Sequence, residues 1–188
     1  MDHNHNMCMS LHWYTIYPKE HYIASEKTRS IIFVNKHIAT DSWTQVDLAS
    51  LDVSVVQVQT AAGKLLIINM YNHCMNTNAI DHVLRVMRTR GGTRNTVGIE
   101  HIIWIGDFNR HHLMWDEDHN MHLFTRTNLD RAQHLINAVI ELNLQMALPK
   151  DLPTLCAMVS GNHMRPKNVF MSALLHSSVV KCMTILEE

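Results

Sequence analysis

The middle of the chain carries the run Ile102-Ile103-Trp104-Ile105-Gly106-Asp107-Phe108-Asn109-Arg110-His111-His112. Its first four residues are apolar and are bounded by a glycine, which predicts a buried strand. The Gly-Asp step ends that strand, because glycine adopts turn dihedrals at no steric cost and aspartate hydrogen-bonds its own local backbone. We therefore expect Asp107 and Asn109 at the carboxyl end of a core strand, where ligands gather in open α/β sheets. On spacing alone, a plain turn is the more frequent meaning of Gly-Asp.

The sequence before this run predicts mostly β structure. Aromatic and β-branched residues are dense in short segments that polar loops and a proline separate. We expect strands at residues 13–17, 31–34, 53–59 and 64–69, with residues 41–47 as a connection or a short strand. Residues 60–63 have the composition of a hairpin turn, so antiparallel pairing is expected here.

Two amphipathic helices are expected, one on each side of the central run. In the first, apolar residues recur at i, i+3, i+4 and i+7 from Ile80, with Asn78 as its cap and Gly91-Gly92 as its end. The second begins after a cap at Asn128 and closes at Leu148-Pro149. Further short strands are expected at residues 146–148, 169–171 and 179–185. Strands mixed with a few helices suit two packed sheets with helices outside.

The composition suits one globular domain. The chain has 188 residues, 46% of them apolar, a formal net charge of −1 and a pI near 6.9. That balance gives nucleic-acid binding no support, although a local basic groove stays open. The four cysteines are far apart, which favours free thiols. We expect a polar, disordered segment at residues 1–11 and a single domain at residues 12–188. With neither a signal peptide nor a long apolar run, an intracellular location, nuclear or cytoplasmic, is expected.

Several further motifs follow a fixed order along the chain. They are Thr28-Arg29-Ser30, Val34-Asn35-Lys36, Trp43-Thr44-Gln45-Val46-Asp47, Ile67-Ile68-Asn69-Met70-Tyr71-Asn72, Trp115-Asp116-Glu117-Asp118-His119-Asn120, Leu148-Pro149-Lys150-Asp151, and Arg165-Pro166 with Asn168-Val169-Phe170. Together with the central run they resemble the endonuclease/exonuclease/phosphatase superfamily, and most closely the endonuclease domain of fungal non-LTR retrotransposons. The resemblance implies an α/β (α+β) fold of two packed, mainly antiparallel sheets flanked by helices. This four-layer sandwich is expected to be incomplete at both ends.

The resemblance also implies a chemistry. Phosphodiester hydrolysis needs an activated water, a cation that absorbs charge on the phosphoryl oxygens, and help for the leaving oxygen. By its match, Asp107 orients or deprotonates the water, while Asn109 contacts a phosphoryl oxygen or the metal shell. Tyr71 is implied as a phosphate-binding hydroxyl; apart from the resemblance, it is a half-buried strand end. The implied cofactor is Mg²⁺, or Mn²⁺, with Asp107 and Asn109 as candidate ligands, because Mg²⁺ binds carboxylate and amide oxygens while retaining waters.

Four more residues are candidates for contact with a DNA substrate. Asn72 follows Tyr71 in a segment where the family places a phosphate-binding amide. Arg110, His111 and His112 follow the Gly-Asp-x-Asn motif, so they are expected to contact a DNA strand or to position the loop. A zinc site is not expected, because adjacent side chains of an extended segment point apart and no third ligand lies at metal-binding spacing.

The chain departs from the family pattern at three points. The family's metal-binding glutamate cannot be placed among residues 1–20, and Glu20 and Glu26 lie outside any matching context. The family ends in a Ser-Asp-His segment, which the chain does not reach. Position 167 is Lys, where the retrotransposon form usually has an Asp that partners the catalytic histidine. Removing members of a cooperating catalytic set is usually severe.

These departures lead to one principal expectation and three rivals. We expect a retroelement-derived, Mg²⁺-dependent DNA endonuclease whose activity in this copy is weak or absent. One rival is an active nuclease that draws its missing groups from unmatched residues such as His3, His5 or Glu20. The others are a non-catalytic nucleic-acid-binding or scaffold module, and a non-functional gene fragment that does not fold stably.

Overall fold

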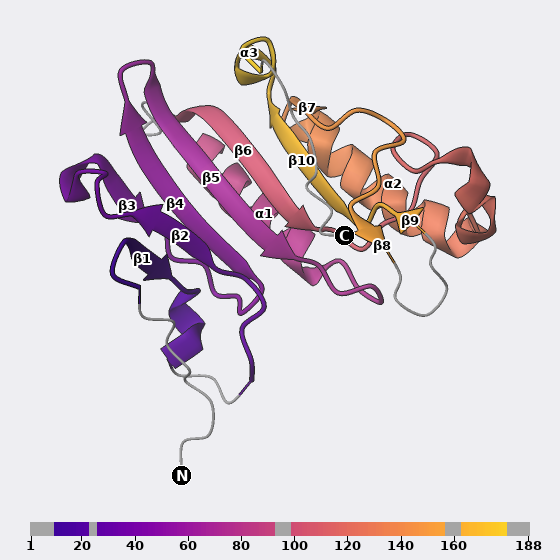
Figure 1. Cartoon of the computed structure of the whole chain (residues 1–188), viewed down its shortest axis with the longest axis horizontal. Coiled ribbons are helices and arrows are strands. Elements are labelled where there is room, and N and C mark those ends of the chain that lie inside the picture. The colour runs from indigo at the N-terminus through magenta and orange to yellow at the C-terminus, as the bar shows by residue number, and fades with distance from the viewer. Residues whose placement is uncertain (1–9, 23–25, 93–98, 157–162, 180–188) are drawn as a thin grey trace.

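A six-stranded sheet forms the centre of the computed structural model, which describes residues 10–22, 26–92, 99–156 and 163–179 (Figure 1). Its strands, in spatial order, are β3 (Trp43–Gln45), β4 (Val53–Thr60), β5 (Gly63–Tyr71), β6 (Ile99–Asp107), β10 (Lys167–Ser172) and β7 (Leu144–Met146). Strands β5 and β6 run parallel, whereas the other neighbours pair antiparallel. The predicted mixed α/β class with mainly antiparallel pairing is confirmed.

Two helices, α1 (Asn78–Gly92) and α2 (Arg126–Glu141), cover one face of this sheet (Figure 1). Alternate strand residues point to the same face of a sheet, so every second residue of the central strands meets the helices. The main core therefore joins strand residues such as Ile68 and Trp104 to helix residues such as Ile80 and Leu135. Burial of apolar surface of this kind is the dominant stabilising contribution to folding.

The opposite face packs against a second, two-stranded antiparallel sheet made of β1 (Trp13–Ile16) and β2 (Ile32–Asn35). Ile16 and Val34 of that sheet are buried against Val56 of β4. The second sheet thus lies over the β4 side of the large sheet, as Figure 1 shows. This arrangement confirms the predicted packing of two sheets with helices outside.

Short elements complete the described part of the chain. They are the 3₁₀ helices η1 (Lys19–Tyr22), η2 (Thr40–Ser42) and η3 (Asp118–Leu123), the hairpin of β8 (Leu155–Cys156) and β9 (His163–Met164), and α3 (Ala173–His176). Among the described residues, no helix has the length and apolar character needed to cross a membrane.

The second helix, α2, begins and ends at other residues than predicted. Asn128 lies inside α2, and Thr125 is the cap, because the Thr125 side chain accepts the backbone N–H of Asn128. The helix ends at Glu141 rather than at Leu148-Pro149, since Asn143 adopts a left-handed φ of 51°, a common way to terminate a helix.

The start of α1 and the last predicted strand also differ, whereas α1 ends at Gly92, as the Gly91-Gly92 pair predicted. Asn78 is the first residue of α1 rather than its cap, and the Thr77 carbonyl accepts the Asp81 N–H. Of the strand expected at residues 179–185, Val179 lies outside any strand and the remainder lies outside the described residues. The predicted disorder of residues 1–11 concerns mostly residues that also lie outside the described part.

Candidate active site

Tyr71, Asp107 and Lys167 lie in register where neighbouring strands of the large sheet start or end. Tyr71 is the last residue of β5 and pairs in register with Asp107, the last residue of β6. On the other side of β6, Asp107 pairs with Lys167, the first residue of β10. Residues directly opposite each other on paired strands point to the same face. That face is the one opposite the helices, because the alternating residues Ile102 and Trp104 point into the helix-covered core.

Asp107 is half-buried and lies in a turn that holds its carboxylate. The Asn109 backbone N–H donates to Asp107 Oδ1 at 3.1 Å. Burial raises the pKa of Asp107 above its ordinary value, while the Asn109 hydrogen bond and the charges of Lys167 and His111 act in the opposite direction. A carboxylate with a raised pKa accepts a proton more readily than a fully solvated one.

Gly106 lets β6 approach β5 closely just before Asp107. Its φ is +149°, and a Cβ placed there would lie 1.9 Å from the Met70 carbonyl oxygen. No side chain fits, so the glycine of the motif is required by packing as well as by dihedral angle. Gly106 is thus a paired residue of β6, and the strand ends one residue later, at Asp107.

Asn109 has a left-handed φ of 49°, a conformation that asparagine tolerates because its short side chain bonds locally. Its side-chain Nδ2 donates to the Asn72 carbonyl oxygen at 2.8 Å. That bond holds the Asn109 amide against the start of the loop after β5. Asn109 thus lies next to Asp107, as its place in the motif implies.

Asn72 and Arg110 form a buried support beneath the site. The Asn72 backbone N–H donates to the Asp107 carbonyl at 2.7 Å, and its fully buried amide donates to the carbonyls of His73, Asn76 and Phe108. Arg110 as a whole is 2% exposed. Its guanidinium donates to the carbonyls of His73, Cys74 and Asn76 and to that of the preceding residue, Asn109. Burial lowers the pKa of Arg110. Both side chains are placed to hold the loop after β5 against the loop after β6.

His111 is directed by a buried acid. Its Nδ1 lies 3.4 Å from Oδ2 of Asp116, whose side chain is inaccessible to solvent. The same carboxylate accepts the His112 N–H at 3.0 Å and the Arg165 N–H at 3.1 Å. The loop after β6 and the segment at Arg165 therefore both contact Asp116, and His111 is held close enough to Asp107 for its charge to lower that residue's pKa.

The His112 ring occupies a different environment. It packs at 5.3 Å from the Trp115 ring, and its Nδ1 accepts the Met114 N–H at 3.1 Å. Burial lowers the pKa of His112. The two neighbouring histidines thus have separate partners, which agrees with the expectation that their side chains diverge.

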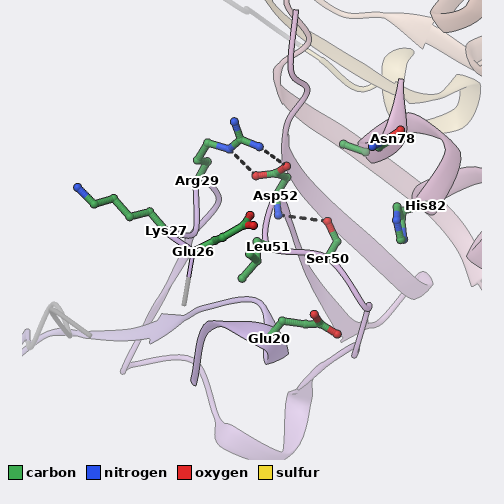
Figure 2. A pocket seen from close by; sticks show the side chains of 10 residues that line it. Glu20, Glu26, Lys27, Arg29, Ser50, Leu51, Asp52, Asn78 and His82 are labelled. Carbon is green, nitrogen blue, oxygen red and sulfur yellow. Dashed lines mark hydrogen bonds and ion pairs between the residues drawn. The ribbon is translucent and has the colours of Figure 1, made fainter. Parts of the chain in front are cut away.

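A polar cavity of about 450 Å³ adjoins the site on the β4 side. Arg29 and Asp52 line this cavity, and Figure 2 shows the two hydrogen bonds between them. Arg29 Nε donates to Asp52 Oδ1 at 2.7 Å, and Arg29 Nη2 donates to Asp52 Oδ2 at 2.6 Å. The same guanidinium lies 4.5 Å over the Tyr71 ring. The Asp52 carbonyl accepts the Tyr71 N–H, so the cavity wall and Tyr71 are one connected unit. Glu20, which one rival interpretation named as a replacement catalytic group, also lines the cavity together with Glu26.

Comparison with models of protein families identifies the family of this chain. Residues 65–164, more than half of the chain, match the model of the endonuclease-reverse transcriptase family. The chain belongs to this family. The match contains the Tyr71, Asp107 and Asn109 constellation, and it confirms the resemblance stated from the motifs. No curated protein sequence matches the chain.

One solved structure is similar at the level of the fold, and two others match with lower TM-scores. The endonuclease domain of TRAS1, a telomere-specific non-LTR retrotransposon, superposes with a TM-score of 0.59 and 18% identity, over 88% of this chain and 69% of that domain. The Haemophilus ducreyi cytolethal distending toxin matches with a TM-score of 0.46 and 13% identity, over 85% of this chain and 53% of that one. A synaptojanin inositol polyphosphate 5-phosphatase domain, solved with inositol (1,4)-bisphosphate and calcium, matches with a TM-score of 0.41 and 13% identity, over 76% and 51%.

The donors for a divalent cation are few in this family member. Asp107 and Asn109 supply one carboxylate and one amide oxygen, and the described residues contain no group of three His, Cys, Asp or Glu side chains that could hold a metal. Mg²⁺ retains several waters and uses one or two carboxylates plus substrate phosphate oxygens. The described donors therefore do not form a metal cage of their own.

Three contributors to the site were not assigned from the sequence. Asp52 immediately precedes a strand that pairs with β5, which was the available signal for its place beside Tyr71. Asp116 entered the sequence analysis only as part of a motif, and its burial follows from contacts that no local pattern reveals. Lys167 was noted only as the loss of an acid, although it faces Asp107 across the strand pair.

Proposed function

We propose that this member of the endonuclease-reverse transcriptase family is a DNA endonuclease of low activity that hydrolyses phosphodiester bonds at Asp107. The observation that supports it best is the register pairing of Tyr71 with Asp107 at the carboxyl ends of two parallel strands. A half-buried carboxylate and a phenol on adjacent strand ends are suited to act on one phosphoryl group from two sides. Family membership supports a nuclease or phosphodiesterase chemistry.

The residues divide the reaction between them. Asp107 accepts a proton from a water as the water oxygen forms a bond to phosphorus. The bond from phosphorus to the leaving sugar oxygen breaks, and that oxygen departs with the electron pair and takes a proton from solvent. The Tyr71 hydroxyl donates a hydrogen bond to a non-bridging oxygen, while Asn109 keeps the turn closed around the carboxylate. Arg110 and Asn72 hold the two loops together and do not contact the phosphate in this scheme.

In this proposal a divalent cation would bind together with the substrate, between its phosphate and the protein. Mg²⁺ or Mn²⁺ would supply charge neutralisation at the phosphoryl oxygens, with the Asp107 carboxylate and the Asn109 amide oxygen as its protein donors. The small number of donors among the described residues is the reason that we propose a low rate.

The test uses a labelled DNA duplex incubated with purified protein and Mg²⁺. We expect slow strand cleavage that EDTA abolishes and that Asp107→Ala removes. A matched control is Asp118→Ala, because Asp118 is an exposed carboxylate of η3. Cleavage that survives Asp107→Ala would contradict the assignment of Asp107.

The second candidate is a DNA-binding module without cleavage. It is favoured by the same scarcity of metal donors and by the lysine that faces Asp107. This candidate predicts affinity for DNA that falls steeply with salt and no strand cleavage by a cooperatively folded protein.

A further inference from the structure

Lys167 is fastened to the turn that carries Asp107. The carbonyl of the preceding residue, Pro166, accepts the N–H groups of Phe108 and Asn109 at 2.9 and 3.2 Å. The Lys167 N–H itself donates to Thr154 Oγ1 at 3.2 Å. Hydrogen bonds therefore join the backbone at Lys167 both to the Gly-Asp-x-Asn turn and to Thr154.

The Lys167 side chain points to the same face as Asp107, because the two residues are directly paired on antiparallel strands. A lysine side chain is longer than an aspartate side chain, so its ammonium can reach beyond the carboxylate toward solvent. Lys167 is exposed, and its ammonium has no ion pair within 4 Å among the described residues. Lys19 and Lys150, in contrast, have carboxylate partners at 2.8 and 3.3 Å.

We propose that Lys167 binds a non-bridging phosphate oxygen of DNA at the candidate active site, an inference that rests on the proposed DNA substrate. A carboxylate at a strand end repels a phosphodiester, so the site needs a cation beside Asp107. The described residues supply few donors for a metal there, whereas they do supply a lysine whose backbone is held by hydrogen bonds and whose ammonium lies more than 4 Å from every described carboxylate oxygen. Compact lysine ammonium groups bind phosphate as point charges. Lys167 thus contributes substrate affinity in a chain whose net charge is −1.

Exposed lysines are usually solvated and bind nothing, so the test must report on direct contact with phosphate. Each phosphate contact releases a condensed counterion, and losing one reduces the slope of log K against log salt concentration by roughly 0.9 on duplex DNA. Binding of a labelled duplex is measured by fluorescence anisotropy in EDTA across a salt series, where neither cleavage nor metal affects the result.

We expect Lys167→Met to reduce the salt slope by about one, to weaken binding uniformly across DNA sequences, and to leave the urea midpoint unchanged. Lys167→Arg should keep the slope, because the positive charge is retained. Lys19→Met is the matched control, because it removes an equal charge from η1, where the ammonium already pairs with Asp47. This variant should leave the salt slope unchanged. Equal slopes for Lys167→Met and wild type would overturn the proposal.

The outcomes separate this proposal from the proposed endonuclease. A wild type that binds no DNA at low salt would overturn both. Binding with a slope that depends on Lys167, but with no Asp107-dependent cleavage, would support the Lys167 contact and contradict the endonuclease. Asp107-dependent cleavage with a slope that ignores Lys167 would do the reverse.

Discussion

Tyr71 and Asp107 end two parallel neighbouring strands at the same level, and their side chains share one face of the sheet. The arrangement follows from the chain connectivity, because α1 carries the chain from the end of β5 to the start of β6. A crossover between parallel strands places both carboxyl ends at one edge, where loops are free to vary. The candidate site therefore has Tyr71 and Asp107 at the ends of core strands, and its remaining residues lie at neighbouring strand ends and in the loops.

Replacing Asp107 by Asn should stabilise the protein while it removes activity. The folded-state pKa of Asp107 is raised by burial, so the fold prefers the neutral form. The ionised carboxyl therefore costs stability at pH values above its folded pKa, and this cost fades as the pH falls toward the unfolded value of 3.8. Urea denaturation at pH 7 should show a higher midpoint for Asp107→Asn than for wild type, and the difference should shrink near pH 4. A lower midpoint at pH 7 would contradict the burial of this carboxylate.

Gly106→Ala should destabilise the fold severely. The left-handed φ costs a non-glycine residue about 1–3 kcal/mol, and the overlap with the Met70 carbonyl adds a further penalty of roughly 1–3 kcal/mol. Thermal unfolding followed by circular dichroism measures the loss. Ala62→Gly in the exposed β4–β5 turn is a useful comparison, since it changes a similar volume outside the core. A Gly106→Ala protein as stable as wild type would mean that β5 and β6 approach each other less closely.

Arg110→Lys distinguishes a supporting residue from a DNA-contacting one. The buried guanidinium donates to several backbone carbonyls, and lysine cannot reproduce that fork, so unfolding should become easier by about 1–3 kcal/mol. Arg85→Lys, at an exposed position of α1, should have little effect. Unchanged stability together with weaker DNA binding would return Arg110 to the role that the motif alone implied.

Asp116→Asn tests the buried carboxylate that gathers His111, His112 and Arg165. Each carboxylate oxygen accepts one backbone N–H, from His112 or from Arg165. The introduced amide replaces one of these acceptors by a donor, so one N–H is left unpaired at a cost of about 1–3 kcal/mol. Asp118→Asn, whose carboxylate is 87% exposed, is the control and should be close to neutral. A neutral Asp116→Asn would indicate that the loop after β6 is held by its other contacts.

Local patterns predicted the elements that create the site. The β-branched residues of β4 and β5 and the Gly-Asp step at the end of β6 are local features, so they can be recognised from the sequence alone. The caps were predicted less well, because Thr125 and Asn128 are both good capping residues and only the backbone geometry selects between them.

The supporting contacts were outside the reach of local patterns. Arg110 and Arg165 are among the most buried side chains, although arginine is usually exposed. Their partners are backbone carbonyls of distant segments, which carry no residue-specific signal. The pairing of Lys167 with Asp107 likewise depends on the register between β10 and β6, and register is a tertiary property.

The most direct test of the central claim is the rate of nicking of supercoiled plasmid in Mg²⁺ by wild type and by Asp107→Asn. The substituted protein is expected to be at least as stable as wild type, so unfolding cannot explain a loss of activity. The account predicts slow nicking by wild type that EDTA abolishes and that Asp107→Asn lacks. Equal nicking by both proteins, or none from a cooperatively folded wild type, would contradict it.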